Sequence, residues 1–284
     1  MKLTEEFELA IKESIKYNYD HLNQERNDGK YYENEYADLI KAFFENHNPK
    51  IDSYETNYSS RYKCISICAF ASSGRLCYLF FRPQGANFEV PLYNDLNNLV
   101  PTKMDAVIGK TNYECKCQEI VSASHEPLRG AYLDSALFKE FGVKTIEAEL
   151  IIKKNKETNK TEKYYVLKFN IEELNIHLPK SKDYSKLHFD LKQLICHLIA
   201  IANNNPNGNQ ELEYVFFTPN KDVIRKYKKV GSLYYTLEQE ISAIFAKDSS
   251  ISKFALKHHI KLKSPRFIEI GSIEDFNYIE KYTK

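Results

Sequence analysis

The stretch TKMDAVIGKTNYECKCQE, residues 102–119, constrains the fold more than any other part of the chain. Apolar and polar residues alternate on both sides of Gly109, the pattern of a β-hairpin closed by a two-residue turn with glycine in the first central position. Counting outward from that turn places Asp105 opposite Glu114. If the loop is instead the four residues GKTN, Asp105 lies opposite Lys116.

Both registers put the same side chains on one face of the hairpin, because side chains alternate along a strand. That face carries Asp105, Glu114, Lys116 and Gln118. The opposite face, which is expected to face a core, carries Met104, Ala106, Ile108, Tyr113, Cys115 and Cys117. Directly opposed carboxylates repel one another unless a cation compensates. Oxygen ligands suit Mg²⁺, so the pattern predicts a divalent metal site. A solvated hairpin with ordinary surface acids is the competing interpretation.

The remaining apolar periodicities predict an α/β fold in one domain covering residues 1–284. We expect a mixed β-sheet flanked by helices, with an inserted hairpin and a mainly helical C-terminal extension over 220–284. The expected helices cover 3–22, 31–46, 127–142 and 184–206, and the expected strands cover 63–70, 76–81, 103–108, 112–119, 146–154, 163–170, 212–219 and 266–270.

Composition favours a globular protein of the cytoplasm. Hydrophobic residues make up 43% and charged residues 28%, and no apolar run approaches the ~18 residues of a membrane span. The six cysteines mostly lie in apolar runs and are expected to be reduced. Cys115 and Cys117 share a strand face, which leaves a zinc site as an alternative. The basic segments 223–229 and 257–266 suit phosphate backbones or form solvated faces.

These residues resemble the PD-(D/E)xK nuclease superfamily, the fold of many restriction and repair nucleases. Asp105 matches the signature Asp of one strand, and Glu114-Cys-Lys116 matches the (Asp/Glu)-x-Lys of the next. The expected element order is also similar over about residues 30–219, with residues 1–29 as an extra N-terminal helix. No Pro precedes Asp105, which departs from the signature.

The resemblance implies a Mg²⁺-dependent hydrolysis of DNA, with Mn²⁺ as an alternative ion. Asp105, Glu114 and the backbone carbonyl of Cys115 would hold the ion. A helix carboxylate would assist them; Glu33 fits the family's helix spacing better than Glu35, which remains open. Lys116 would stabilise charge on the phosphate or activate water.

Three further polar residues have weaker family parallels. Some RecB-like nucleases carry Gln-x-x-x-Tyr on the helix that follows the insertion, and this chain has Gln193 and His197 there. A helix-surface Gln and a satisfied interface His are nevertheless the preferred interpretation of these two positions. His125 follows the second signature strand, where a contact with substrate phosphate is an additional hypothesis. Gln118 would hold Lys116 or a metal-bound water in place.

The favoured biology is a restriction, defence or repair endonuclease whose partner is DNA, with no membrane association. Cutting both strands with one site per chain would favour a homodimer. The alternative is a catalytically silent module that keeps the nuclease fold and binds DNA or protein.

Overall fold

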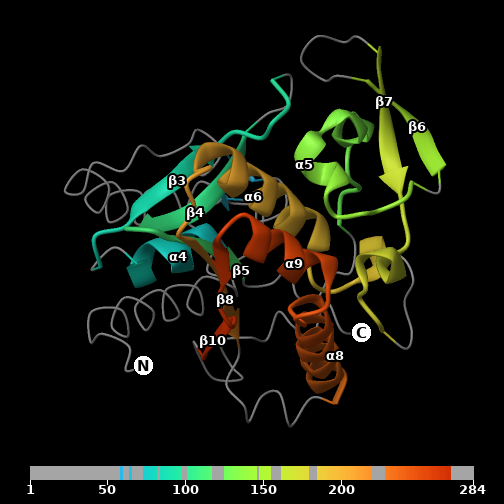
Figure 1. Cartoon of the computed structure of the whole chain (residues 1–284). Helices are drawn as coiled ribbons and strands as arrows, with labels where there is room; N and C mark the ends of the chain where they lie inside the picture. The colour runs from blue at the N-terminus through green and yellow to red at the C-terminus, as the bar shows by residue number, and fades with distance from the viewer. Residues whose placement is uncertain are drawn as a thin grey trace.

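The computed structural model describes residues 58–59, 64–65, 73–81, 84–97, 101–116, 125–145, 147–154, 161–178, 184–218 and 228–269. The expected N-terminal helices, with Glu33 and Glu35, lie outside these ranges, as do Cys117 and Gln118. A mixed β-sheet with helices on both faces forms the centre of the described part (Figure 1). The expected α/β class is confirmed at this level. Among the described residues, no helix is both long and apolar enough to cross a membrane.

The central sheet has the strand order β10-β8-β5-β4-β3, and β9 also pairs with β8. Its strands are β3 (Asn87–Leu92), β4 (Thr102–Ile108), β5 (Thr111–Lys116), β8 (Gln210–Thr218), β9 (Ile260–Leu262) and β10 (Arg266–Glu269). The first three form an antiparallel meander, whereas β8 runs parallel to β5, β9 and β10. Strand β5 therefore lies between two other strands, at the junction of the antiparallel and parallel halves.

The β4–β5 hairpin has the register predicted from the two-residue turn. Ile108 pairs with Thr111 and Ala106 with Tyr113, so the four-residue loop is wrong. Gly109 has φ +57, and the positive-φ positions do not include the second turn residue. A type II′ turn needs positive φ at its first central residue alone, which explains the glycine.

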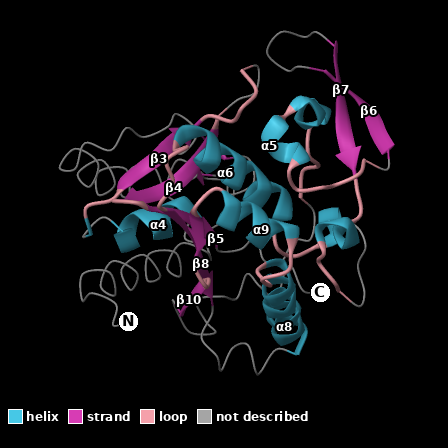
Figure 2. Cartoon of the chain, viewed as in Figure 1, coloured by secondary structure: helices cyan, strands magenta, loops and turns pink. Residues whose placement is uncertain are grey.

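Helices α4 (Ser73–Phe81) and α6 (Leu191–Asn204) cover opposite faces of the sheet (Figures 1 and 2). Successive residues of β5 show this arrangement. The ring of Tyr113 lies 4.3 Å from that of Phe81 in α4, whereas the Glu114 carboxylate contacts Gln193 in α6. Because both faces are covered, Thr111 to Cys115 are all buried. The solvated-hairpin interpretation is therefore wrong.

The predicted strand 76–81 is wrong, because these residues form most of helix α4. Its buried residues fit a helix face, since Leu76 and Cys77 recur one turn later as Phe80 and Phe81. A short, continuously apolar run does not distinguish a buried strand from a buried helix, and this is the physical reason for the error. Short strands β1 (Tyr58–Ser59) and β2 (Cys64–Ile65) pair with each other outside the central sheet.

The inserted hairpin is confirmed as β6 (Glu147–Lys154) and β7 (Thr161–Lys168), an antiparallel pair separate from the central sheet. The helix predicted over 127–142 is divided into a 3₁₀ helix, η4 (Gly130–Asp134), and a short α-helix, α5 (Ala136–Lys139). Ser135 separates them, and its side chain accepts a hydrogen bond from Phe138 N as the N-cap of α5.

The C-terminal part contributes both helices and strands. Helices α8 (Lys228–Ile244) and α9 (Ser250–Lys257) agree with the expected helical content. The predicted strand at residue 266 is β10, but β9 and the edge strand β3 were not predicted. The short turns η5 (Ile171–Leu174) and η6 (Tyr184–Lys186) lead into α6, which begins later than residue 184.

Candidate active site

Glu114 and Lys116 form the centre of the candidate site, on the α6 face of β5. Their pairing partners in the neighbouring strand β8 are Tyr214 and Phe216. The Glu114 side chain is 2% exposed, and the Lys116 amine lies 2.6 Å from its Oε1 atom. The central strand thus holds a carboxylate that is almost fully removed from water, with its neutralising cation two residues further along.

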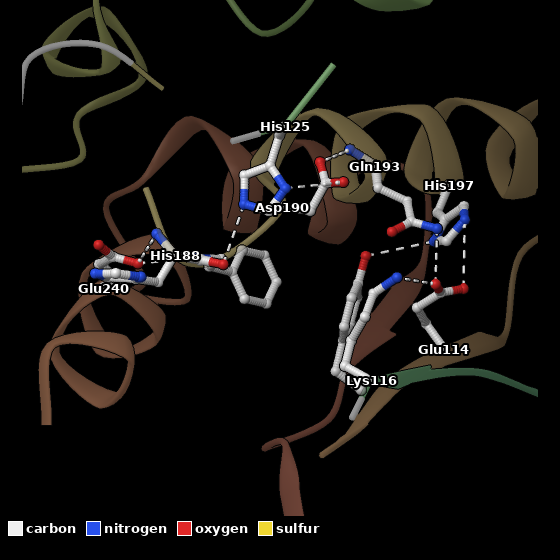
Figure 3. Close-up of polar contacts among 10 residues, drawn as sticks. Glu114, Lys116, His125, His188, Asp190, Gln193, His197 and Glu240 are labelled. Carbon is white, nitrogen blue, oxygen red and sulfur yellow. Dashed lines mark hydrogen bonds and ion pairs between the residues drawn. The ribbon is translucent and has the colours of Figure 1, made fainter. Parts of the chain in front are cut away.

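Helix α6 supplies a second donor to the same carboxylate oxygen. Gln193 Nε2 donates to Glu114 Oε1 over 2.7 Å, a contact drawn in Figure 3. Asp190 caps the start of the helix, since its Oδ1 accepts a hydrogen bond from Gln193 N at 2.9 Å. The cap fixes the first turn of α6, and with it the position of the Gln193 amide above the sheet.

His197 lies one helical turn beyond Gln193 and is also directed at Glu114 (Figure 3). Its ring is fully buried, and Nε2 lies 3.7 Å from Glu114 Oε2. Burial, reinforced by the charges of Lys116 and Lys192, lowers the pKa of His197 to about 3. The ring is therefore neutral at physiological pH. On its other side, Nδ1 lies 3.4 Å from the Tyr214 hydroxyl.

Asp105 lies one position beyond Ala106, the last residue of β4 that pairs with β5, and therefore on the face of Glu114. Its carboxylate bonds to backbone: Oδ2 accepts a hydrogen bond of 2.6 Å from Cys115 N. This contact ties the signature Asp to the residue between Glu114 and Lys116. Cys115 is itself fully buried against α4, as expected for a core residue rather than a zinc ligand.

A histidine and a loop border the site on the side of Lys116. His125 Nδ1 lies 3.5 Å from Asp190 Oδ2, and its Nε2 lies 3.1 Å from the His188 carbonyl oxygen. The loop is the segment with His188 and Phe189 that precedes α6. Glu240 of α8 holds it, because Oε2 of Glu240 accepts hydrogen bonds from the backbone N–H groups of both residues (Figure 3). Burial raises the pKa of Glu240 despite these two bonds. A cavity of about 50 Å³ is lined by Lys116, His125, His188, Phe189, Asp190, Tyr214 and Phe216.

The structure thus brings together two groups of predicted residues that are 79 positions apart in the sequence. Gln193 is not a helix-surface residue, which corrects the preferred interpretation of that position. His125 lies beside Lys116 in the lining of one cavity, but its ring nitrogens face protein acceptors. Tyr214 and Glu240 were missed, because an apolar strand and an amphipathic helix give no signal of polar contacts made across the fold.

The predicted basic segment 257–266 lies mainly against acids of the opposite sheet face. Lys263 Nζ is 2.8 Å from Glu213 Oε2, and Arg266 pairs with the same carboxylate. Glu213 is 2% exposed, like Glu114, but its neighbour in β5 is Tyr113, on the α4 side. The chain therefore buries two carboxylates of equal exposure on adjacent strands, one on each face of the sheet.

The residues around Glu114 fit a divalent cation in their chemistry. Within the described ranges, two fully buried atoms beside this carboxylate have no hydrogen-bond partner, Gln193 Oε1 and His197 Nε2. The amide oxygen carries lone pairs of the kind that ligate a cation or its water, and Nε2 does so in the tautomer that is protonated at Nδ1. A complete cluster is not assembled, since no group of three or more His, Cys, Asp or Glu among the described residues is arranged to hold a metal. Asp105 points instead to Cys115 N, and Glu33 lies outside the described residues.

Comparison with known proteins gives no match to this chain. No protein-family model, no curated protein and no solved structure is significantly similar to it. The functional argument therefore depends on the chemistry of the site.

Proposed function

We propose that this chain is a divalent-metal-dependent deoxyribonuclease of the PD-(D/E)xK type. The observation that carries the proposal is the convergence on one carboxylate oxygen: Lys116 Nζ lies 2.6 Å and Gln193 Nε2 2.7 Å from Glu114 Oε1. The matching signature residues thus lie together on a central strand, under a helix that carries the Gln of some RecB-like nucleases. A restriction, defence or repair role, DNA as partner and a homodimer belong to the same proposal.

Glu114 would hold the metal ion together with Asp105, the Cys115 carbonyl and Glu33. Once bound, Mg²⁺ or Mn²⁺ would lower the pKa of a bound water and neutralise charge on the phosphate. Glu114 is suited to that role because Gln193 fixes its orientation and α6 excludes bulk water from it. Asp105 is tied to the Cys115 amide, so the same hydrogen bond would position the Asp105 carboxylate and the Cys115 carbonyl.

Lys116 would stabilise negative charge that develops on the phosphate. Its amine is held as a cation against Glu114, and its side chain is 14% exposed at the edge of the small cavity. A point charge on a flexible stem can move from the carboxylate to a phosphate oxygen without leaving the site. We therefore assign Lys116 charge stabilisation, in preference to proton abstraction. Gln118, outside the described residues, would orient this amine or a water.

A catalytically silent binding module is the second candidate, and the contact of Asp105 favours it. An Asp105 carboxylate that bonds to Cys115 N is satisfied without a metal ion, as is a Glu114 neutralised by Lys116. Such a module would bind DNA or protein but would not cleave DNA when Mg²⁺ or Mn²⁺ is added. A metal-dependent cleavage assay therefore separates the two candidates.

The test is incubation of the purified full chain with supercoiled, linear and single-stranded DNA in Mg²⁺, Mn²⁺ or EDTA. Cleavage is expected in either metal and not in EDTA. Asp105→Asn and Lys116→Met should each reduce the rate by at least about a hundredfold, because each removes a group that acts on the ion or the phosphate. Absence of metal-dependent cleavage on all three DNA forms would refute the proposal and favour the silent module.

A further inference from the structure

His197 is a buried base that the proposed mechanism does not use. Its side chain is fully buried, and Nε2 has no hydrogen-bond partner in the part of the chain that the structure describes. An unsatisfied buried polar atom costs about 1–3 kcal/mol, so its retention calls for an explanation. Nε2 is directed at Glu114, with 3.7 Å between it and Oε2 (Figure 3).

The surroundings of the ring leave Nε2 free to act as a ligand. The Tyr214 hydroxyl, 3.4 Å from Nδ1, can accept the Nδ1 proton. A hydrogen bond at one ring nitrogen fixes the tautomer, which then presents the lone pair of the other nitrogen. Tyr214 would thus accept a hydrogen bond from the ring nitrogen that does not bind the metal, as carbonyls and carboxylates do beside many metal-binding His residues.

The distance between Nε2 and Oε2 is slightly larger than that between two ligands of one ion. Bonds of about 2.1 Å to a common ion place neighbouring octahedral ligands about 3.0 Å apart and tetrahedral ligands about 3.4 Å apart. The observed 3.7 Å exceeds these values, so the two side chains would approach each other by about 0.3–0.7 Å on binding an ion. Imidazole nitrogen, in turn, is a ligand for transition metals, whereas Mg²⁺ prefers oxygen.

We propose that His197 Nε2 and Glu114 Oε2 ligate the same divalent ion, and that this nitrogen makes the site selective for a transition metal such as Mn²⁺ over Mg²⁺. The inference rests on the proposed metal-dependent function and specifies its ion. In the competing structural role, Nε2 keeps its proton and directs it at Glu114, and the ring never contacts a metal.

The test is pulsed EPR on the full chain without a histidine tag, stripped with EDTA and loaded with Mn²⁺. Coordination by His197 predicts ¹⁴N modulation from an imidazole, which His197→Gln abolishes. His125→Gln is the matched control, because His125 lies near the site but its nitrogens face Asp190 and the His188 carbonyl. This control should keep the modulation. Calorimetric titration should show the Mn²⁺-to-Mg²⁺ affinity ratio falling about tenfold or more in His197→Gln and remaining unchanged in His125→Gln.

The outcomes separate the inference from the function on which it rests. One outcome is that Mn²⁺ binds the wild type but not Glu114→Gln, and that the wild type shows no ¹⁴N modulation. This result would overturn the role of His197 and leave the proposed nuclease intact. Modulation that persists in His197→Gln would overturn it as well. If no Mn²⁺ binds in a manner that depends on Glu114, both the ligand and the proposed metal site are refuted. Far-UV circular dichroism of each variant verifies that the fold is retained.

Discussion

Lys116→Met should destabilise the protein because it leaves Glu114 as a buried charge without its cation. The substitution removes an ammonium 2.6 Å from a carboxylate that is 2% exposed and replaces it with an apolar side chain of similar length. Removing one partner of a buried ion pair typically costs about 3–5 kcal/mol. Gln193 would still donate to Glu114, so we expect the lower end, about 3 kcal/mol.

A second substitution should reverse most of that loss. Glu114→Gln in the Lys116→Met background removes the isolated charge, and at least about 1.5 kcal/mol of stability should return. Lys110→Met is the matched control, since Lys110 belongs to the same hairpin but is 61% exposed, with its amine 3.3 Å from Glu211. An exposed pair of this kind contributes about 1 kcal/mol at most.

The measurement is urea unfolding at pH 7 in EDTA, followed by far-UV circular dichroism, with the four proteins compared at equal m-values. The reasoning is refuted if Lys116→Met costs no more than Lys110→Met. It is also refuted if the double variant is less stable than Lys116→Met alone.

Three further predictions concern other residues of the hairpin and of α6. His197→Gln should make the stability of the protein less dependent on pH under acid conditions. The unfolded His binds a proton below about pH 6.5, whereas folded His197 binds one only near its pKa of about 3. The free energy of unfolding of the wild type therefore falls as the pH drops between these values, by up to about 1.4 kcal/mol per pH unit. The measurement is the urea midpoint of both proteins from pH 7 to 4 in EDTA, and an equal change of the midpoint with pH in wild type and variant would contradict the prediction. Gly109→Ala should lower the free energy of unfolding by about 1–2 kcal/mol, because a residue with a Cβ is strained at φ +57 even though nothing lies within 4 Å of that atom. An unchanged midpoint in thermal or urea unfolding would disprove the strain. Gln193→Leu should lower the rate of DNA cleavage at least about tenfold, because Glu114 loses the donor that orients it. The far-UV circular dichroism spectrum should be unchanged, and full activity in this variant would exclude the orienting role.

The hairpin could be predicted from the sequence because its determinants are local. A glycine with positive φ fixes the turn, the turn fixes the register, and the register fixes which side chains share a face. The same local logic correctly gave the β6–β7 hairpin and the buried strand β8. The sequence alone therefore predicts that the side chains of Glu114 and Lys116 share one face.

Properties that depend on distant contacts could not be read in this way. The apolar run that forms α4 satisfies either a strand or a helix until it packs against Tyr113 and Cys115. Gln193 and His197 flank the apolar stripe of α6, and only the sheet packed below shows that His197 is buried and that the amide of half-buried Gln193 contacts Glu114. The contact of Asp105 with Cys115 N reflects the side-chain conformation at the end of the paired ladder, which strand periodicity does not specify.

The central claim is that Glu114 is a catalytic carboxylate, and a matched pair of substitutions tests it most directly. Glu114→Gln and Glu213→Gln each neutralise a carboxylate that is 2% exposed on adjacent strands, but on opposite faces of the sheet. Single-turnover cleavage of DNA in Mn²⁺ and in Mg²⁺ should fall by at least about a hundredfold in Glu114→Gln and stay near wild type in folded Glu213→Gln. Equal cleavage by Glu114→Gln and wild type would contradict the account.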